Sequence, residues 1–248
     1  MTSVIGWLLL DGEHILPTGE RLSPAMILPE GGRVTPGVSG FGAYTTALDA
    51  LRSAQGPWLC QVRLEGSLHP GKYVGDVWAS RQILLADPVD CSRFLREFAC
   101  DCIERALPIY EEQCPHDNRV RQVIEVARKF ATGAATPEDL AAAAIGAMRI
   151  VIDINEATRR DSNIDSEIQD IDNSRHVAEA AAAVTLVPAQ LAARAASGHI
   201  LEASADKAGR PGSGVELQWQ ERTLVKYFEA SLRCTAIAKL EELDIWLG

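Results

Sequence analysis

The sequence lacks any long hydrophobic run. The N-terminal apolar stretch from Val4 to Leu10 is short, is interrupted by Gly6 and has no basic flank. A membrane-spanning helix needs roughly 20 apolar residues, and an export signal needs a positively charged start. We therefore expect a cytoplasmic protein that does not associate with membranes.

The sequence also lacks cysteines at a spacing that would let them bind one metal ion. Without an export signal, the cysteines are expected to be reduced thiols. Cys100 and Cys102, near Cys114 and His116, would point about 200° apart on a helix and could not share a zinc ion. We predict no metal site and treat the six cysteines as core or surface residues: Cys60, Cys91, Cys100, Cys102, Cys114 and Cys234.

Basic residues are too few for nucleic-acid binding. The chain has 24 Lys and Arg against 34 Asp and Glu, which gives a formal net charge of −10. Affinity for a phosphate backbone comes largely from Lys and Arg, so nucleic acid is not an expected partner. The acidic residues are spread thinly along the chain, which favours a solubilising surface over a mimic of DNA.

Motifs that carry catalysis are absent from the sequence. It contains no phosphate-binding loop, dinucleotide fingerprint, HExxH pair or nucleophile elbow. The histidines are far apart in sequence and are interpreted as isolated surface or capping residues: His14, His69, His116, His176 and His199. We predict no catalytic residue and no cofactor, which leans against an enzyme.

The sequence divides into two modules. Residues 1–88 hold short apolar runs between Gly and Pro turn signals, which is typical of strands. Strands are expected at 3–10, 57–65 and 77–86, with a short helix that Thr46 begins. This N-terminal module is therefore predicted to be a mixed β/α module.

Residues 89–248 are predicted to form an alanine-rich helical module, and the whole chain is assigned to the α+β class. Alanine has the highest helix propensity and lets helices pack closely, so an antiparallel array is expected. A helix start is expected at Asp87-Pro88, followed by a helix over 94–106 that Pro108 kinks or ends and a helix from Asp117 to Phe130. A further helix is expected to start at Thr136-Pro137, and an amphipathic polar segment to cover 159–173. A loop is expected at 209–214, before a final helix with a Ser213–Glu216 capping box.

One local segment is a candidate site for a ligand or partner. Glycines around an aromatic residue before a capped helix let a backbone approach a ligand closely. The same pattern is typical of a structural turn between strand and helix, and both interpretations stay open. The candidate residues are Ser39, Gly40, Phe41, Gly42, Tyr44 and Thr45.

Several blocks of the chain resemble a family of bacteriophage and prophage proteins. Residues 40–65 read GFGAYTTALDALRSAQGPWLCQVRLE and hold the family's glycine turn and its Asp-Ala-Leu helix at 49–51. Its proline-led strand corresponds to residues 57–66, which end one position beyond this string. Further blocks at 84–87 and 219–228 also fit, whereas 161–174 departs from the usual alanine-rich tract. The resemblance implies a phage-linked origin in a bacterial host cytoplasm and gives no activity.

Two shorter segments resemble other proteins. Residues 114–119, CPHDNR, with Ala127 and Phe130 beyond them, are similar to the opening of a helical domain described as an immunity protein in bacterial genomes. The glycine-aromatic-Thr strand and small helix also resemble part of the ADP-ribosyltransferase fold. That resemblance would make Tyr44 the aromatic residue and Glu65 the acid, but the family's full triad has no match here.

Three functions follow as hypotheses. The first is an interaction protein or host-modulating factor that binds a protein partner. The second is an ADP-ribosyltransferase-like enzyme or nucleotide-binding sensor using the N-terminal module, which a polar cleft beside Tyr44 would favour. The third is a structural or assembly component of a phage particle, which stable rings would support. A homo-oligomer is compatible with each of them.

Overall fold

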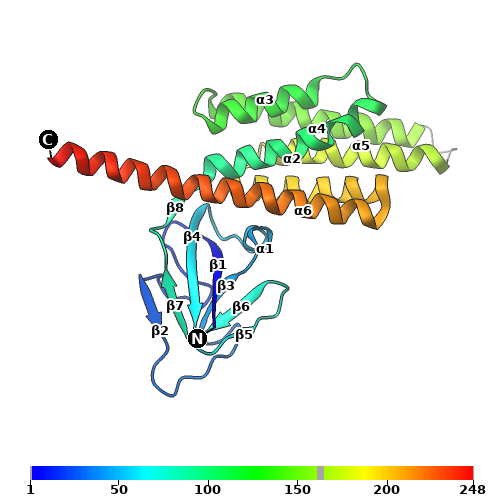
Figure 1. The fold of residues 1–248 in the computed structure, drawn as a ribbon. Helices are drawn as coiled ribbons and strands as arrows, with labels where there is room; N and C mark the ends of the chain where they lie inside the picture. The colour runs from blue at the N-terminus through cyan, green and yellow to red at the C-terminus, as the bar shows by residue number, and fades with distance from the viewer. Residues whose placement is uncertain (1, 161–164, 248) are drawn as a thin grey trace. The chain divides into compact units, whose positions relative to one another are not determined.

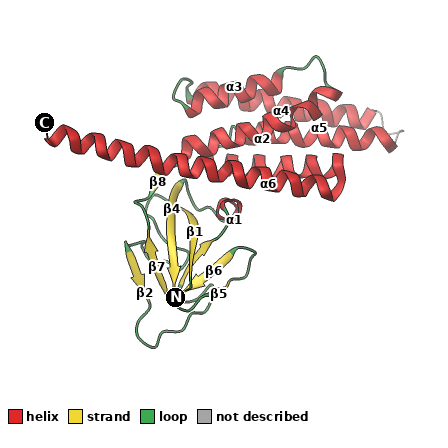
Figure 2. Cartoon of the chain, viewed as in Figure 1, coloured by secondary structure: helices red, strands yellow, loops and turns green. Residues whose placement is uncertain are grey.

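The chain forms an α+β protein in the computed structural model (Figures 1 and 2). The structure describes residues 2–160 and 165–247. Their side chains are described except in residues 158–171, 206–212 and 236–247. It divides into two compact units, one of Met1–Cys91 with Leu224–Gly248 and one of Ser92–Thr223. The predicted fold class is confirmed. None of the described helices has a stretch long and apolar enough to cross a bilayer.

The first unit is built on one antiparallel sheet. Its strand order is β2-β7-β4-β1-β3-β6-β5, and β8 also pairs with β4. The strands are β1 Ser3–Leu10, β2 Ala25–Ile27, β3 Phe41–Tyr44, β4 Trp58–Glu65, β5 His69–Pro70, β6 Asp76–Ala79, β7 Arg81–Leu84 and β8 Val89–Asp90. The strand expected over 77–86 is divided at Ser80. Strand β6 pairs with β3, whereas β7 pairs with β4, and β3 and β4 lie on opposite sides of β1 in the strand order.

The predicted short helix covers part of this sheet's core. Helix α1, Ala47–Arg52, begins after Thr46, whose hydroxyl oxygen accepts a hydrogen bond from the Asp49 amide, as expected of a cap. In β4, Cys60, Val62 and Leu64 alternate as fully buried residues. This period of two follows from side chains pointing to opposite faces of a strand.

The C-terminal part of the chain completes the core of the first unit. Leu224 and Phe228, near the middle of helix α6 (Ala189–Leu247), are fully buried. The Phe228 ring lies 5.4 Å from the Trp7 ring of β1, centroid to centroid. The first unit therefore groups the N-terminal segment up to Cys91 with a C-terminal segment from Leu224. The division into modules 1–88 and 89–248 stays a prediction.

The second unit is a helical array with an alanine-rich core. Its small residues at close spacing include Ala178 and Ala181 of α5 and Ala192 and Ala196 of α6, all fully buried. Alanine at such positions lets helix axes approach closely. The other helices are α2 Ser92–Gln113, α3 Arg119–Ala131, α4 Pro137–Arg160 and α5 Asp165–Ala183.

Helix α2 differs from the expectation at both ends. It begins at Ser92 and not at Asp87-Pro88, because Val89 and Asp90 extend the sheet beside β4. Pro108 does not end it. A proline inside a helix removes one backbone hydrogen bond, which costs about 3 kcal/mol. Pro108 itself is exposed, whereas Leu107 and Tyr110 next to it are buried, and their packing keeps the helix continuous.

The predicted helix starts at 117 and 136 have different outcomes. Helix α3 begins at Arg119 after Asn118, and Asp117 accepts a hydrogen bond from the Arg119 amide. The start at Thr136-Pro137 is confirmed. There the Asp139 amide donates to the Thr136 hydroxyl oxygen while the Asp139 carboxylate accepts from the Thr136 amide, a reciprocal capping box.

The predicted loop at 209–214 and the capping box after it are wrong. Helix α6 is continuous from Ala189 to Leu247, and Glu216 is a buried residue inside it. Buried residues on each side, from Ile200 and Ala203 to Gln220 and Leu224, favour one helix over two. In the polar segment expected over 159–173, residues 161–164 and the side chains up to 171 lie outside the described part of the chain.

Candidate binding surface

The predicted site segment begins in a turn of the first unit. The Ser39 amide donates to the Thr35 carbonyl oxygen at 2.8 Å, and the Ser39 hydroxyl donates to the Arg33 carbonyl oxygen at 2.7 Å. Gly40 has a φ of +104°, a left-handed value that glycine adopts without strain. Phe41 is a buried member of the sheet core. These contacts give this end of the segment a structural role.

The other half of the segment also bonds within its own unit. A Cβ atom on Gly42 would lie 2.8 Å from the Trp78 ring, so that ring fills the space above the glycine. Thr45 donates to the Gly75 carbonyl oxygen from both its amide and its hydroxyl. Burial raises the pKa of Tyr44, against the opposing hydrogen bond with Ser53. Ligand binding at this segment stays a prediction.

The two residues suggested by the transferase resemblance lie apart. Tyr44 and Glu65 pair with positions of β1 that are four residues apart, which is about 13 Å at the rise of a strand. Glu65 is held in ion pairs with Arg63 at 2.8 Å and Arg81 at 3.4 Å. Tyr44 and Glu65 are therefore not neighbours in the sheet.

Two of the cysteines considered as metal ligands, Cys100 and Cys102, are core residues. Cys100 and Cys102 of α2 are both fully buried. Burial raises the pKa of Cys100 to about 12 and that of Cys102 well above its usual value. A thiolate is the form that binds metals and attacks electrophiles, so neither thiol is set up for such chemistry.

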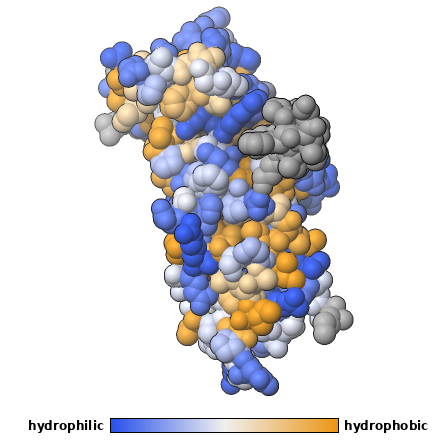
Figure 3. All heavy atoms as spheres, turned by 90° about the vertical axis from the view of Figure 1, so that its left-hand side faces the viewer, coloured by the Kyte–Doolittle hydropathy of each residue, from blue (hydrophilic) through white to orange (hydrophobic). Residues whose placement is uncertain are grey.

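Exposed apolar residues by themselves do not single out one region of the surface. On the face drawn in Figure 3, hydrophobic residues gather in several patches between hydrophilic ones. Scattered apolar residues of this kind are normal on folded proteins. A binding surface has to be recognised by what accompanies them, such as a hollow or an unpaired charge.

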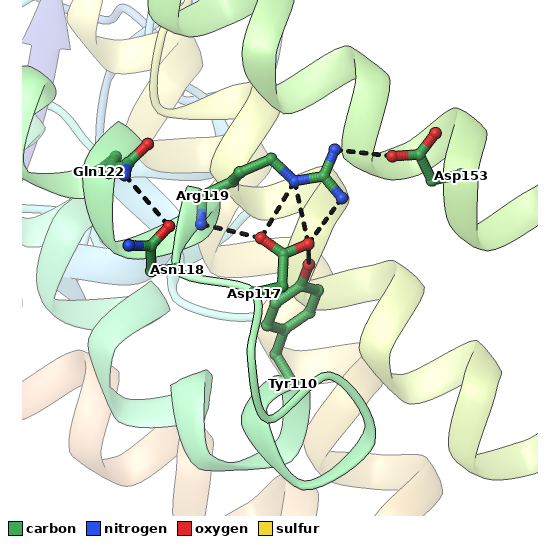
Figure 4. A network of polar contacts seen from close by, with 6 residues as sticks. All are labelled: Tyr110, Asp117, Asn118, Arg119, Gln122 and Asp153. Carbon is green, nitrogen blue, oxygen red and sulfur yellow. Dashed lines mark hydrogen bonds and ion pairs between the residues drawn. The ribbon is translucent and has the colours of Figure 1, made fainter.

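A polar network ties the α2–α3 connection to α4 (Figure 4). Its centre is Arg119, whose guanidinium donates to Asp117 through Nε and Nη2 and to Asp153 of α4 through Nη1 at 2.6 Å. The Tyr110 hydroxyl of α2 donates to the same Asp117 carboxylate at 2.8 Å. Two carboxylates and one guanidinium, with the Tyr110 hydroxyl, thus join three helices.

Asp117 and Arg119 are both charged at neutral pH. Hydrogen bonds from Arg119 hold the pKa of Asp117 at about 2, against a usual value of 3.8. Burial and then the bond to Asp117 raise the pKa of Tyr110. An acid with so low a pKa is a poor proton donor near pH 7, so the network positions helices and does not resemble a general acid–base pair.

A hollow of about 680 Å³ lies beside this network, between α3 and α4. Small residues on the α4 side leave it open, and a Cβ atom on Gly146 would meet no atom within 4 Å. The walls include Arg119, Gln122, Val126 and Lys129 from the α3 side and Ala142, Gly146 and Arg149 from α4.

The cations around the hollow differ in their partners. Arg119 is bonded to two carboxylates, and Lys129 forms an ion pair with Glu125 at 2.7 Å. Arg149 is exposed and has no ion pair among the residues whose side chains are described. Arg149 is therefore the cation at the hollow that is available to an incoming acidic group.

An exposed apolar stripe runs along α4 next to the hollow. Ile145, Met148 and Ile152 are 58%, 61% and 53% exposed. Their spacing of three and four residues puts them on one side of the helix, away from the buried side that holds Ala147 and Ile150. We call the hollow with Arg149 and this stripe together the α3–α4 face.

Sequence reasoning missed this face for a physical reason. Helix α4 carries apolar residues on two sides, and the sequence pattern alone does not show which side the neighbouring helices cover. The signal was a second row at helical spacing, 145, 148 and 152, beside the row of Leu140, Ala147, Ile150 and Ile154.

The α3–α4 face lies in the part of the chain that matches a known protein family. Residues 91–160 match the family described as "Imm-5 like putative immunity protein". No curated protein and no solved structure matches the chain. The predicted similarity to an immunity domain is thus confirmed for a segment from Cys91 to the end of α4, which contains the polar network and the whole α3–α4 face.

Proposed function

We propose that this protein is an immunity-type binding protein, which acts by binding a protein partner at its α3–α4 face. The observation that carries the proposal is the coincidence of three features within residues 91–160. The hollow, the uncovered apolar stripe and the unpaired Arg149 all lie in the segment that matches the immunity family. Exposed apolar residues beside a groove are typical of protein interfaces.

The chemistry of the face defines the partner it would take. Ile145, Met148 and Ile152 expose large apolar side chains. Full burial of an exposed side chain of this size would stabilise a complex by about 1.5–3 kcal/mol. Arg149 would pair with an acidic group on the partner, and arginine is enriched among the residues that dominate binding energy. The fitting partner presents apolar side chains around a carboxylate.

The biological setting belongs to the same proposal. The resemblance of residues 40–65 to phage and prophage proteins supports a phage-encoded origin and action in the bacterial cytoplasm. In that setting the first unit would serve as a scaffold or as a second contact surface through Ser39 to Thr45. Catalysis is not required, because an immunity-type protein can block its target by occupying it.

Capture of a partner by matched surface variants tests the proposal. The tagged full chain would be used to capture proteins from bacterial lysate, with and without phage infection. Met148→Glu places a charge in the stripe and should remove the captured partner. Val215→Glu is the matched control, because Val215 is also a helical residue with 61% exposure but lies outside the α3–α4 face.

The results separate the alternatives. A partner that is captured stoichiometrically by the wild type and by Val215→Glu, but not by Met148→Glu, supports the proposal. Capture that survives Met148→Glu excludes the α3–α4 face as the contact surface. Light scattering of the purified chain gives a further check, because stable large rings would favour an assembly component instead.

A further inference from the structure

Two histidines that are distant in sequence lie side by side in the second unit. The rings of His176 on α5 and His199 on α6 are 6.2 Å apart between centroids and inclined by 29°. The interpretation of all histidines as isolated is therefore wrong for this pair. The turn that brings them together is fixed by Arg96, whose guanidinium donates to the carbonyl oxygens of Val184 and Leu186.

Each histidine is followed three residues later by a glutamate. Residues three apart share one side of a helix, so Glu179 and Glu202 join the two imidazoles at one place. The Nδ1 atom of His176 lies 3.2 Å from Oε2 of Glu179 and 3.3 Å from Oε2 of Glu202. The Nδ1 atom of His199 lies 3.3 Å and 3.7 Å from the same two oxygens.

These separations have the scale of a tetrahedral metal site. Bonds of about 2.0–2.2 Å from Zn²⁺ to imidazole nitrogen and carboxylate oxygen put neighbouring ligand atoms about 3.3–3.6 Å apart. One ligand atom each from His176, His199 and Glu202 lies within 4.8 Å of the other two. Two imidazoles with carboxylates favour a first-row divalent ion over Mg²⁺ or Ca²⁺, which prefer oxygen alone.

An unsatisfied atom points to a ligand at this place. Nδ1 of His199 is buried and makes no hydrogen bond with any residue that the structure describes, although Oε2 of Glu179 is 3.3 Å away. A buried polar atom without a partner is costly, and coordination would remove that cost. Glu202 is 61% exposed, which gives an ion a route from solvent.

We propose that His176, His199 and Glu202 bind a first-row divalent metal ion such as Zn²⁺. The Glu179 carboxylate, whose Oε2 lies 3.2 Å from Nδ1 of His176, adds nearby negative charge that attracts the ion. The ion would clamp α5 to α6, and this role is independent of partner binding at the α3–α4 face.

Protonated histidines in ion pairs with the glutamates are the competing explanation. The full chain, freed of any histidine tag and treated with EDTA, would be titrated with Zn²⁺ by calorimetry and with Co²⁺ in visible absorption. We expect one equivalent to bind, tetrahedral Co²⁺ bands, and a rise in the thermal unfolding midpoint that EDTA reverses. Mg²⁺ should produce none of these changes.

Variants assign the ligands. His199→Ala should weaken Zn²⁺ binding at least 100-fold, and Glu202→Gln, which preserves side-chain shape, should weaken it about 10–100-fold. His69→Ala, which removes an exposed histidine of the first unit, should bind as the wild type does. Failure of the wild type to bind Zn²⁺ at micromolar concentration overturns the proposal, and so does unchanged binding by Glu202→Gln. If His199→Ala does not fold, the Glu202→Gln titration and the Co²⁺ spectrum of the wild type decide.

Discussion

Replacing Asp117 by Asn removes the charge at the centre of the polar network while keeping an oxygen that can accept from Tyr110 and Arg119. The pKa of Asp117 falls from 3.8 to about 2 in the folded protein, which corresponds to about 2.4 kcal/mol before screening. The Asp117 and Arg119 side chains are 19% and 39% exposed, so solvent reduces this to about 1–1.5 kcal/mol. We expect Asp117→Asn to lower the free energy of unfolding by that amount at pH 7.

The pH dependence gives this prediction its sign. A carboxylate with a lowered folded-state pKa stabilises the protein above pH 3.8, and its contribution is lost as the pH falls toward 2. The difference between wild type and Asp117→Asn should therefore shrink to about half between pH 7 and pH 3.

Urea unfolding followed by the helical circular dichroism signal at both pH values measures these differences. Asp153→Asn is the control, since Asp153 is 58% exposed and its ion pair with Arg119 should contribute less than about 0.5 kcal/mol. An Asp117→Asn protein as stable as the wild type at pH 7, or a difference that stays constant down to pH 3, would refute the reasoning.

Three further outcomes test the packing. Phe228→Ala should lower the stability of the sheet unit by about 3–5 kcal/mol in urea unfolding, because the ring is fully buried against a tryptophan of β1; a change confined to the helical unit would contradict the assignment of this segment. Gly42→Ala should lower the melting temperature, because its new methyl would lie 2.8 Å from the Trp78 ring. Cys100, whose pKa is raised to about 12 by burial, should react with a thiol reagent in native protein far more slowly than exposed Cys234, and equal rates would argue against a buried α2.

Much of the fold could be predicted from the sequence because local patterns agreed with the packing. The strand over 57–65 and the helix start at Thr136-Pro137 were predicted from local signals, and both are found as expected. The loop at 209–214 was wrong, and Pro108 does not end α2, since a local helix-breaking preference of a few kcal/mol competes with burial that the local sequence does not reveal.

The candidate sites were harder to predict because they depend on contacts across helices. His176 and His199 are 23 positions apart, and only the turn between α5 and α6 brings their rings together. The repeated pattern of a histidine followed three residues later by a glutamate was the available signal. Arg149 could not be recognised as unpaired without knowing which carboxylates surround Arg119 and Lys129.

The affinity of the captured partner for charge-reversal variants tests the central claim most directly. In calorimetric titration of the purified partner, Arg149→Glu should weaken binding at least tenfold, because the cation beside the hollow would be replaced by an anion. Arg222→Glu, at an exposed position of α6 outside the α3–α4 face, should bind with unchanged affinity. Equal affinities for the wild type and both variants would contradict the assignment of the α3–α4 face as the binding surface.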